Sequence, residues 1–391
     1  MIDWHPTEPD HPETRADDAM LKASSNHLKS RGLTGPALLV DAARARANIR
    51  AMADKARRSE VAFRPHFKSH QSPVVGRWFA DEGVAGITVS SVDMAERFAA
   101  SGWRDITIAF LLNPLEMPRI RDLAAALGRR GGKLGLTVDS VAAARAAAAP
   151  GIDVWVKVDT GYGRTGVPWD APHALNEVLA AAGRPVGLLT HAGHSYAVRG
   201  GAGLTELLDA TVARLAAARR DAGRPDLKLS LGDTPCCSAA ARFTTIDEIR
   251  PGNFVYYDLM QLQIGSCTEA QVAAAAVCPV VGIYPERKRI VLHGGAVHLS
   301  KESLVRQDGR HIYGQLGALA FDPRSPQGPP AGLGACLTDA PVVALSQEHG
   351  IVEVAGDFRT VAGDLEIGDL VAVWPVHSCL TAHLLPDIVL I

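Results

Sequence analysis

Hydrophobic positions along the chain alternate between short β-type runs and longer helical patterns from Pro36 to about residue 257. The short runs are rich in Val, Ile and Leu, and the segments between them are rich in Ala, Arg and Leu. This alternation is typical of βα units around a parallel sheet. It predicts nine strands, at residues 37–40, 61–67, 86–89, 106–110, 133–138, 154–158, 185–189, 228–231 and 248–254.

After about residue 258 the helical alternation disappears. Val- and Ile-rich runs continue at residues 272–283, 289–293, 342–345, 351–354 and 370–374, separated by Gly- and Pro-rich turns, especially 321–334. A closed βα barrel uses eight strands, so one of the nine belongs elsewhere, and the first is the best candidate because the carboxyl-terminal part is β-rich. The predicted fold class is therefore α/β, with a (β/α)8 TIM barrel at 41–257 and a β domain formed by 31–40 and 258–391.

Residues 1–30 contain Pro6, Pro9 and Pro12 and lack hydrophobic periodicity, which predicts a tail or a loosely packed arm. The first 20 residues are acidic and proline-containing, unlike a signal peptide, and no apolar segment is long enough to span a bilayer. We therefore expect neither secretion nor a membrane partner.

Composition narrows the class of ligand. The 391 residues are 47% hydrophobic and 21% charged, and 40 basic against 42 acidic residues give a net charge of -2. Without a long basic run, nucleic acid is not the expected partner, and a small polar metabolite is. Six cysteines in so long a chain do not form a disulfide framework, which favours a reducing cytoplasm.

The predicted strand at 61–67 leads into the motif R-P-H-F-K-S-H, where Lys68 stands between His66 and His70. Catalytic groups collect at the carboxyl ends of strands in α/β proteins. A lysine held there among apolar neighbours and cationic groups loses proton affinity and becomes a usable amine. We interpret Lys68 as the reactive group, with an ordinary solvated lysine as the alternative.

Two glycine-containing turns follow the predicted seventh and eighth barrel strands. The first carries Gly232 and Asp233 in L-G-D-T-P, and the second carries Asn253 in R-P-G-N. Phosphate sites in such barrels form from these two loops, where glycine lets backbone amides approach an anion. We predict a phosphate site, contacted at Asp233 through its backbone nitrogen because its carboxylate would repel the phosphate.

Strands five and six lead into further candidate site residues. The loop D-T-G-Y-G-R-T-G could present Arg164 at the barrel mouth, where it could bind an anionic oxygen of an aromatic cofactor, or could cap a surface helix. The segment H-A-G-H-S-Y, from His191 to Tyr196, could hold a ring or a substrate carboxylate, although structural histidines are common.

Close to the carboxyl terminus, His377 and Cys379 occur in the motif H-S-C. In an extended segment their side chains would project to one side, so imidazole and thiolate could share a cation such as Zn²⁺. Two protein ligands leave an open position for a substrate. The alternative is a buried cysteine beside a structural histidine, and His349 is a possible neighbour.

Taken together, these motifs resemble the fold type III pyridoxal-phosphate enzymes over about residues 33–385, and within them the D-serine dehydratase and D-threonine aldolase group related to alanine racemase. The resemblance implies an alanine-racemase-type barrel, a β domain, a Schiff-base lysine at Lys68, and a homodimer with the active site near the interface. It further implies contacts of Arg164 with the phenolic oxygen of the cofactor ring and of Tyr196 with the ring nitrogen or substrate, while His191 also binds the cofactor. Gly232, Asp233 and Asn253 are then expected at the phosphate.

Within this group, dehydratases resemble this chain in carrying His-x-Cys, whereas aldolases carry His-x-Asp. Thiolate favours Zn²⁺. The expected activity is that of a lyase that uses pyridoxal phosphate and a metal to remove water from a D-β-hydroxy amino acid, such as D-serine or a D-3-hydroxyaspartate-like compound, giving a 2-keto acid and ammonia. Retro-aldol cleavage to glycine and an aldehyde, racemisation, and non-catalytic cofactor binding are the alternatives. Two motifs depart from the group, Thr34-Gly35-Pro36 and His293-Gly294-Gly295, and the second bears on substrate identity.

Overall fold

The computed structural model describes residues 18–306, 308–321 and 330–391. The chain separates into two compact units. The barrel unit comprises Ala47–Val255 with Gln263–Ser266, and the β unit comprises the described residues up to Arg46 together with Tyr256–Leu262 and Cys267–Ile391.

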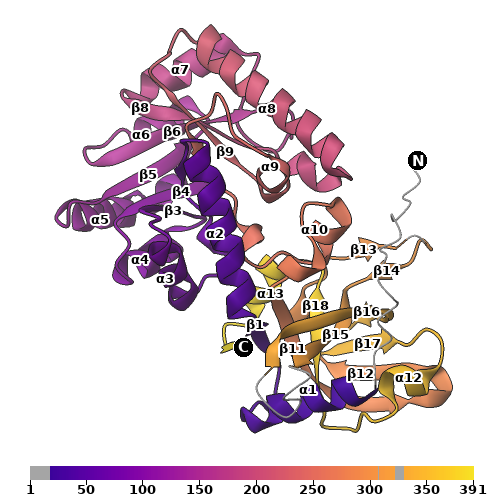
Figure 1. The fold of residues 1–391 in the computed structure, drawn as a ribbon. Helices are drawn as coiled ribbons and strands as arrows, with labels where there is room; N and C mark the ends of the chain where they lie inside the picture. Colours follow the sequence, from indigo (N-terminus) through magenta and orange to yellow (C-terminus); the bar gives the residue numbers. More distant parts are fainter. Residues whose placement is uncertain (1–17, 307, 322–329) are drawn as a thin grey trace. The chain divides into compact units, whose positions relative to one another are not determined.

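In the described part of the barrel unit, eight parallel strands follow the order β2-β10-β9-β8-β6-β5-β4-β3. Of these strands, β3, β4, β5, β6, β8 and β9 are labelled in Figure 1. The bounds of the eight strands are β2 Ala62–Phe63, β3 Gly86–Val89, β4 Asp105–Leu111, β5 Lys133–Val138, β6 Ile152–Asp159, β8 Pro185–His191, β9 Lys228–Gly232 and β10 Glu248–Ile249. A parallel bridge between His66 and Thr88 joins the two ends of this series. The eight-stranded barrel is therefore confirmed, and β7 (Val167–Pro168) pairs with β6 outside the ring.

Helices follow most of the barrel strands and lie outside them (Figure 1). They are α3 Pro73–Asp81, α4 Val92–Ala100, α5 Met117–Gly128, α6 Val141–Ala147, α7 Pro172–Ala182, α8 Gly201–Asp221 and α9 Thr234–Ala239. Helix α2, Ala42–Arg58, precedes the first barrel strand, and α10, Leu259–Ile264, falls mostly within the residues of the β unit. Ser72, Ser91 and Ser140 each accept a hydrogen bond from a backbone amide in the first turn of the next helix, which fixes where α3, α4 and α6 begin. No helix in the described part of the chain is both long and apolar enough to cross a bilayer.

A buried ionic network crosses the barrel strands. Arg64 donates to Glu248 at 2.7 Å and to Asp105 at 2.6 Å. Ser230 donates to Glu248 at 2.6 Å and accepts from Arg250 at 2.7 Å. Because buried charges are costly unless paired, this network fixes how β2, β4, β9 and β10 meet.

In the β unit, strands follow the order β12-β17-β16-β15-β18-β11-β1-β19, and β12 also pairs with β11. Their bounds are β1 Ala37–Val40, β11 Ala274–Tyr284, β12 Arg289–His293, β15 Gly314–Phe321, β16 Pro330–Leu345, β17 His349–Glu353, β18 Leu370–Pro375 and β19 Ile388–Leu390. The smaller elements are β13 Leu304–Val305, β14 His311–Ile312, α1 Asp18–Ser30, α11 Ala296–Leu299, α12 Phe358–Ala362 and α13 Ser378–Leu384. Strand β1 lies between β11 and β19, as predicted for the first strand.

Three predicted segments differ from the structure. The strand expected at 61–67 ends at Phe63, and Phe67–Ser69 forms a 3₁₀ helix, η1, because Pro65 lacks a backbone donor and His66 caps the turn. The run at 248–254 likewise divides into β10 and the 3₁₀ helix η4 (Asn253–Val255) around Pro251. Of the turn expected at 321–334, residues 330–334 belong to β16, and residues 322–329 lie outside the described part.

The prediction of a tail or loose arm is wrong for residues 18–30, which form α1. Leu21 and Leu28 on this helix are fully buried. Lys22 and Lys29 donate to the buried carboxylate of Asp369 at 3.0 and 2.5 Å, and Ser25 donates to it at 3.0 Å. The prediction failed because Asp369, which stabilises this helix, lies more than 300 residues away along the chain, while the local hydrophobic periodicity of the helix is weak. Residues 1–17 lie outside the described part.

Candidate cofactor and metal sites

Lys68 lies in the middle of η1, immediately after barrel strand β2, and its side chain is exposed. The backbone amide of Lys68 donates to Nδ1 of His66 at 3.4 Å. Burial, with the charge of Lys68 adding to it, lowers the pKa of His66 well below its ordinary value. His66 is therefore a neutral acceptor that shapes the turn beneath Lys68.

His70 is likewise a neutral hydrogen-bond acceptor. Its Nδ1 accepts from the amide of Ser72 at 3.1 Å, and burial lowers its pKa to about 3. Burial therefore keeps both imidazoles that flank Lys68 neutral. Phe67 is fully buried against Phe79 and Phe98, so it anchors the turn that carries the lysine.

His191 ends barrel strand β8 and connects Lys68 to the first glycine turn. Its Nδ1 lies 2.7 Å from the carbonyl oxygen of Gly232, so this nitrogen donates and Nε2 keeps its lone pair. Burial lowers the pKa of His191 to about 3, and the charges of Lys68, Arg164 and Arg250 act in the same direction. The neutral ring therefore stands among positive charges at the carboxyl end of the barrel.

The loop after β6 is shaped by Asp159. Its carboxylate accepts the amides of Gly161, Tyr162 and Gly163 at 2.9 Å each. The guanidinium of Arg164 lies 5.0 Å from the ring centroid of Tyr162 and is exposed. The structure thus places Arg164 at the barrel mouth rather than in the cap of a helix.

Beyond His191 the chain forms the 3₁₀ helix η3, Gly193–Ala197, which carries Tyr196. The ring of Tyr162 packs on Gly193, where a Cβ atom would lie only 2.4 Å from a ring carbon. Glycine is therefore required for η3 to lie against the Arg164 loop. Tyr196 is half-buried, and its backbone oxygen accepts from Arg199 at 3.0 Å.

The two predicted phosphate turns lie together. The amide of Gly252 donates to Thr234 Oγ1 at 3.3 Å, and a Cβ atom on Gly252 would lie 2.6 Å from Ser69 Oγ. Asp233 caps the short helix α9 by accepting from the Cys236 amide at 2.7 Å, and burial raises the pKa of its carboxyl to about 6. Asn253 is buried beside these turns, at the start of η4. The two glycine turns, at Gly232 and Gly252, therefore adjoin the turn that carries Lys68.

Sequence reasoning missed one cation of this group, Lys157 on β6. Its Nζ donates to Thr165 Oγ1 at 2.6 Å, and burial together with the charges of Arg164 and Arg250 lowers its pKa to about 8. The available signal was a single lysine inside the apolar run V-W-V-K-V. The guanidinium of Arg250 lies against Gly232, and the charges of Lys68, Arg164 and Arg250 act on His191. This positive environment beside the glycine turns fits a ligand with a dianionic phosphate, as in pyridoxal phosphate.

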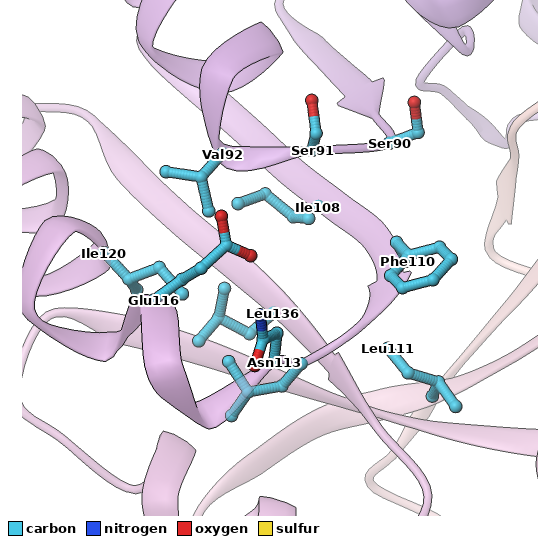
Figure 2. Close-up of a pocket in the computed structure, with 11 residues that line it drawn as sticks. Ser90, Ser91, Val92, Ile108, Phe110, Leu111, Asn113, Glu116, Ile120 and Leu136 are labelled. Carbon is cyan, nitrogen blue, oxygen red and sulfur yellow. The ribbon is translucent and has the colours of Figure 1, made fainter.

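A separate cavity of about 300 Å³ lies at the carboxyl ends of β3 and β4 (Figure 2). Its wall is mostly apolar, and Ser90, Ser91, Asn113 and Glu116 supply its polar groups. The cavity contains none of the predicted site residues, so it is distinct from the Lys68 group, by which we mean Lys68, Arg164, His191 and the two glycine turns at Gly232 and Gly252.

In the β unit, His377 is the N-cap residue of α13, and Cys379 lies in the first turn of that helix. The prediction of an extended segment is therefore wrong. The helix starts here because the His377 carbonyl accepts from Thr381 N at 3.2 Å, and because the buried carboxylate of Asp258 accepts from Ser378 N at 2.9 Å. The two side chains nevertheless meet, since the Cys379 thiol group forms a hydrogen bond with His377.

The surroundings of this pair fit a metal cation. Although burial alone would lower the pKa of His377, the hydrogen bond and charge of Cys379, with the charges of Asp258 and Glu302, raise it to about 9. The Nδ1 atom of His377 is buried and has no hydrogen-bond partner in the described part of the chain. A soft thiolate and an imidazole in a negatively charged environment are a donor set suited to Zn²⁺. His349 lies at the start of β17, where its Nδ1 is 3.3 Å from Ser346 Oγ.

Comparison with known proteins agrees with the division of the chain into a barrel unit and a β unit. Residues 40–259 match the family described as alanine racemase, N-terminal domain, and residues 273–391 match a putative serine dehydratase domain. A D-threo-3-hydroxyaspartate dehydratase from Delftia sp. is 32% identical over 90% of this chain and 93% of its own length. Its solved structure covers 92% of this chain and 95% of the other, with a TM-score of 0.78. A D-serine dehydratase from Dictyostelium discoideum is 24% identical over 93% of this chain and 95% of its own length.

The alanine racemase match alone spans more than half of the chain, and the barrel, the glycine turns and the lysine turn agree with it. The chain therefore belongs to the fold type III pyridoxal-phosphate enzymes, in the family that joins an alanine racemase N-terminal domain to a serine dehydratase domain.

Proposed function

We propose that this protein is a lyase that uses pyridoxal phosphate and a divalent metal to remove water from a D-β-hydroxy amino acid, giving a 2-keto acid and ammonia. D-Serine and D-3-hydroxyaspartate-like compounds are the proposed substrates. The observation that carries the proposal is the 32% identity to a D-threo-3-hydroxyaspartate dehydratase over 90% of the chain. The His377–Cys379 pair at the start of α13 supports it.

The cofactor site is proposed at the carboxyl end of the barrel. Lys68 would hold pyridoxal phosphate covalently, with Arg164 at the phenolic oxygen and Tyr196 near the ring nitrogen or the substrate. Gly232, Asp233 and Asn253 would surround the phosphate, with Asp233 contributing its backbone nitrogen. His191, which is neutral, would offer Nε2 as an acceptor beside the ring.

In this scheme the chain supplies binding, orientation and proton transfer. Bound pyridoxal phosphate would supply an electron sink for the α-carbon, and a metal on His377 and Cys379 would supply a Lewis acid for the β-hydroxyl. The amine of Lys68 would take the α-proton of the substrate on Nζ. The net reaction would lose water from the β-carbon and take up water at the α-carbon, so that a 2-keto acid and ammonia form.

Zn²⁺ is the proposed metal because Cys379 supplies a thiolate, whereas a carboxylate at this position would favour Mg²⁺ or Mn²⁺. A cysteine-to-alanine variant of a D-threo-3-hydroxyaspartate dehydratase, 31% identical and with a TM-score of 0.78, has a solved structure described as the metal-free form. This description links a relative to a metal ion, which supports metal dependence of this chain.

We also propose that the protein is a homodimer and that it is located in the cytoplasm. The dimer follows from the family resemblance. All six cysteines are described and carry free thiols, which fits a reducing compartment.

The test is a product assay with purified protein loaded with pyridoxal phosphate and Zn²⁺. D- and L-forms of serine, threonine and 3-hydroxyaspartate are supplied, and keto acid, ammonia, glycine and aldehyde are quantified. We expect equal amounts of keto acid and ammonia from D-substrates only. Glycine with an aldehyde would instead establish the aldolase, in which the same hydroxyl is deprotonated and the Cα–Cβ bond breaks.

Two further alternatives have their own outcomes in this assay. Interconversion of enantiomers without loss of water, insensitive to chelators, would establish a racemase. Cofactor binding without turnover of any of these compounds would support a protein that only holds pyridoxal phosphate. A D-threonine aldolase from Arthrobacter sp. is 37% identical, but over only 35% of this chain, which makes the aldolase the second candidate.

A further inference from the structure

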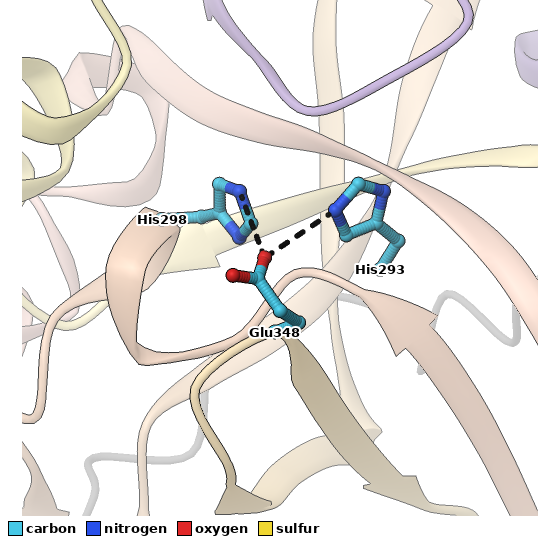
Figure 3. A group of neighbouring side chains, drawn as sticks. All are labelled: His293, His298 and Glu348. Atoms are coloured by element: carbon cyan, nitrogen blue, oxygen red, sulfur yellow. Dashed lines mark ion pairs between the residues drawn. The ribbon is translucent and has the colours of Figure 1, made fainter.

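His293, His298 and Glu348 form a second cluster of metal-ligand type in the β unit (Figure 3). His293 is the last residue of β12, His298 lies in the short helix α11, and Glu348 lies in the turn between β16 and β17. One ligand atom from each side chain lies within 4.8 Å of the other two. Three ligands from three elements, none of them His377 or Cys379, therefore converge on one point.

The backbone holds these three elements together before any ligand binds. The Gly294 amide donates to the Glu348 carbonyl at 2.9 Å, and the Ala296 amide donates to the Ser346 carbonyl at 2.9 Å. A Cβ atom on Gly295 would lie 2.3 Å from the Gln347 carbonyl oxygen, so only glycine allows the two turns to approach so closely. The motif His293-Gly294-Gly295 thus coincides with a preformed convergence of side chains.

The side-chain separations fit an ion between the groups better than a direct bond between them. Glu348 Oε2 lies 3.6 Å from His293 Nε2 and 3.8 Å from His298 Nε2, beyond ordinary hydrogen-bond length. Around a tetrahedral Zn²⁺ with bonds of about 2.0–2.1 Å, neighbouring ligand atoms are on the order of 3.3 Å apart. A shift of a few tenths of an ångström at these partly exposed side chains would bring Glu348 to this spacing with each imidazole.

We propose that His293, His298 and Glu348 form a second divalent-cation site, selective for Zn²⁺ and similar borderline ions, separate from the His377–Cys379 pair. Two imidazoles and one carboxylate suit Zn²⁺, Co²⁺ or Ni²⁺ better than Mg²⁺ or Ca²⁺, which prefer oxygen ligands. Helix α11 packs against α13, and Thr381 Oγ1 donates to the Leu299 carbonyl at 3.5 Å. Cation binding would therefore brace the helix against which the His377–Cys379 segment packs.

One contact must change when the cation binds. In the metal-free protein the Gly295 amide donates to His298 Nδ1 at 3.2 Å, which leaves the ring proton on Nε2, facing Glu348. The cation replaces that proton, and Nδ1 then carries the hydrogen, so the contact with Gly295 is lost. The loss of one such hydrogen bond weakens cation binding on the order of fivefold. This loss is small compared with the total binding free energy of a zinc site with three protein ligands.

The test counts metal ions in the full-length protein loaded with pyridoxal phosphate. Chelator-treated wild type and the Cys379→Ala, Glu348→Gln and His298→Asn variants are titrated with Zn²⁺, and bound metal is measured after desalting. We expect two ions per wild-type chain, one in each single variant, and none when Cys379→Ala is combined with Glu348→Gln. Glu348→Gln keeps the size of a half-exposed side chain, and His298→Asn keeps an acceptor for the Gly295 amide, so loss of folding is not expected.

Co²⁺ identifies which site remains. Bound to Cys379→Ala protein it should give ligand-field absorption without thiolate charge transfer, and bound to Glu348→Gln protein it should keep the charge-transfer band. The control is His173→Ala, because His173 and Glu177 form an exposed pair 3.8 Å apart to which the described residues add no third metal-ligand group; this variant should bind two ions. One ion in wild type, or unchanged binding in both Glu348→Gln and His298→Asn, would overturn the proposal. Because these readouts need no turnover, they are independent of the proposed reaction.

Discussion

Lys68 is the residue that we propose to bind pyridoxal phosphate covalently. Its turn is held by a buried Phe67 and a neutral His66, so replacing the exposed Lys68 side chain should leave the fold unchanged. We predict that Lys68→Ala removes the absorption band of covalently bound pyridoxal phosphate and lowers turnover by about 10²- to 10⁴-fold or more. Borohydride reduction followed by mass spectrometry should detect no adduct. Lys228→Ala, at an exposed lysine on β9, serves as the control, and a trapped adduct in Lys68→Ala protein would refute the assignment.

Cys379 is the residue that we propose, together with His377, to bind the metal. Replacing a thiolate ligand by a methyl group removes its bond to the cation and leaves His377 as the remaining ligand of this pair. We predict that Cys379→Ala loses the ion bound at this pair and its water-eliminating activity, while the cofactor band in the visible spectrum stays. Metal analysis and absorption spectra measure both. Cys336→Ala, at another free cysteine of the β unit, should keep metal and activity; equal losses in both variants would point to general destabilisation.

At this scale, the sequence was informative where a functional group directly follows a strand. The positions of Lys68, Arg164 and His191 after barrel strands could be predicted because the carboxyl ends of these strands meet at one edge; their roles remain proposals. The neutrality of His66 and His70 could not, because it results from burial that exists only in the folded chain. Lys157 was missed for a related reason: inside an apolar run a lysine gives no indication that two arginines lie near it.

Helix α1 is the element with the clearest electrostatic attachment. Lys22 and Lys29 bind the carboxylate of Asp369, whose side chain is fully buried. We predict that Asp369→Asn lowers the free energy of unfolding by about 2–3 kcal/mol, less than for a fully buried pair because Lys29 is 40% exposed. Urea unfolding at pH 7 measures this. Asp364→Asn, at an exposed aspartate in the same loop, should change stability by less than about 0.5 kcal/mol.

The same carboxylate gives a pH dependence of stability. Burial alone would raise the pKa of Asp369, but the hydrogen bonds from Lys29, the Glu366 amide, Lys22 and Ser25 lower it to about 2. An unfolded aspartate titrates near 3.9, so between about pH 4 and pH 2 the unfolded chain binds more protons. The contribution of Asp369 is therefore complete above pH 4 and is lost as the pH falls towards 2. Wild type should lose more stability than Asp369→Asn between pH 4 and pH 2.5 in urea titrations; parallel curves would contradict the shift.

Elements were predictable in their centres and less so at their ends. Val- and Ile-rich runs identified β3, β5 and β12 with their full bounds. The ends of β2 and β10 depend on prolines and a histidine cap, which turn the chain into 3₁₀ helices. Strand β15 was missed because Gly and Ala dominate it; Gly317 is needed there, since a Cβ atom would lie 2.5 Å from Trp374 Nε1.

For the whole molecule, counting strands was enough to assign the fold class. Nine expected strands and an eight-stranded barrel required that the first strand leave the barrel, and β1 indeed pairs with β11 and β19. Counting could not find α1, whose contacts with Asp369 lie more than 300 residues away along the chain. Long-range pairing of this kind has no local sequence signal.

The division of the chain into two units predicts that the two proposed cofactors, pyridoxal phosphate and the metal ion, can be removed separately. The Lys68 group belongs to the barrel unit, whereas His377 and Cys379 belong to the β unit. We predict that a strong chelator abolishes the elimination of water while the visible band of bound pyridoxal phosphate persists. The substrate hydroxyl would lose its Lewis acid, whereas Lys68 would remain bonded to pyridoxal phosphate. A Lewis acid contributes several kcal/mol to such a step, so the rate should fall by at least about a thousandfold and return on adding Zn²⁺. Metal content, spectra and ammonia release are followed in one titration, with buffer-treated protein as the control. Undiminished turnover in protein proved free of metal would exclude the metal-dependent reaction.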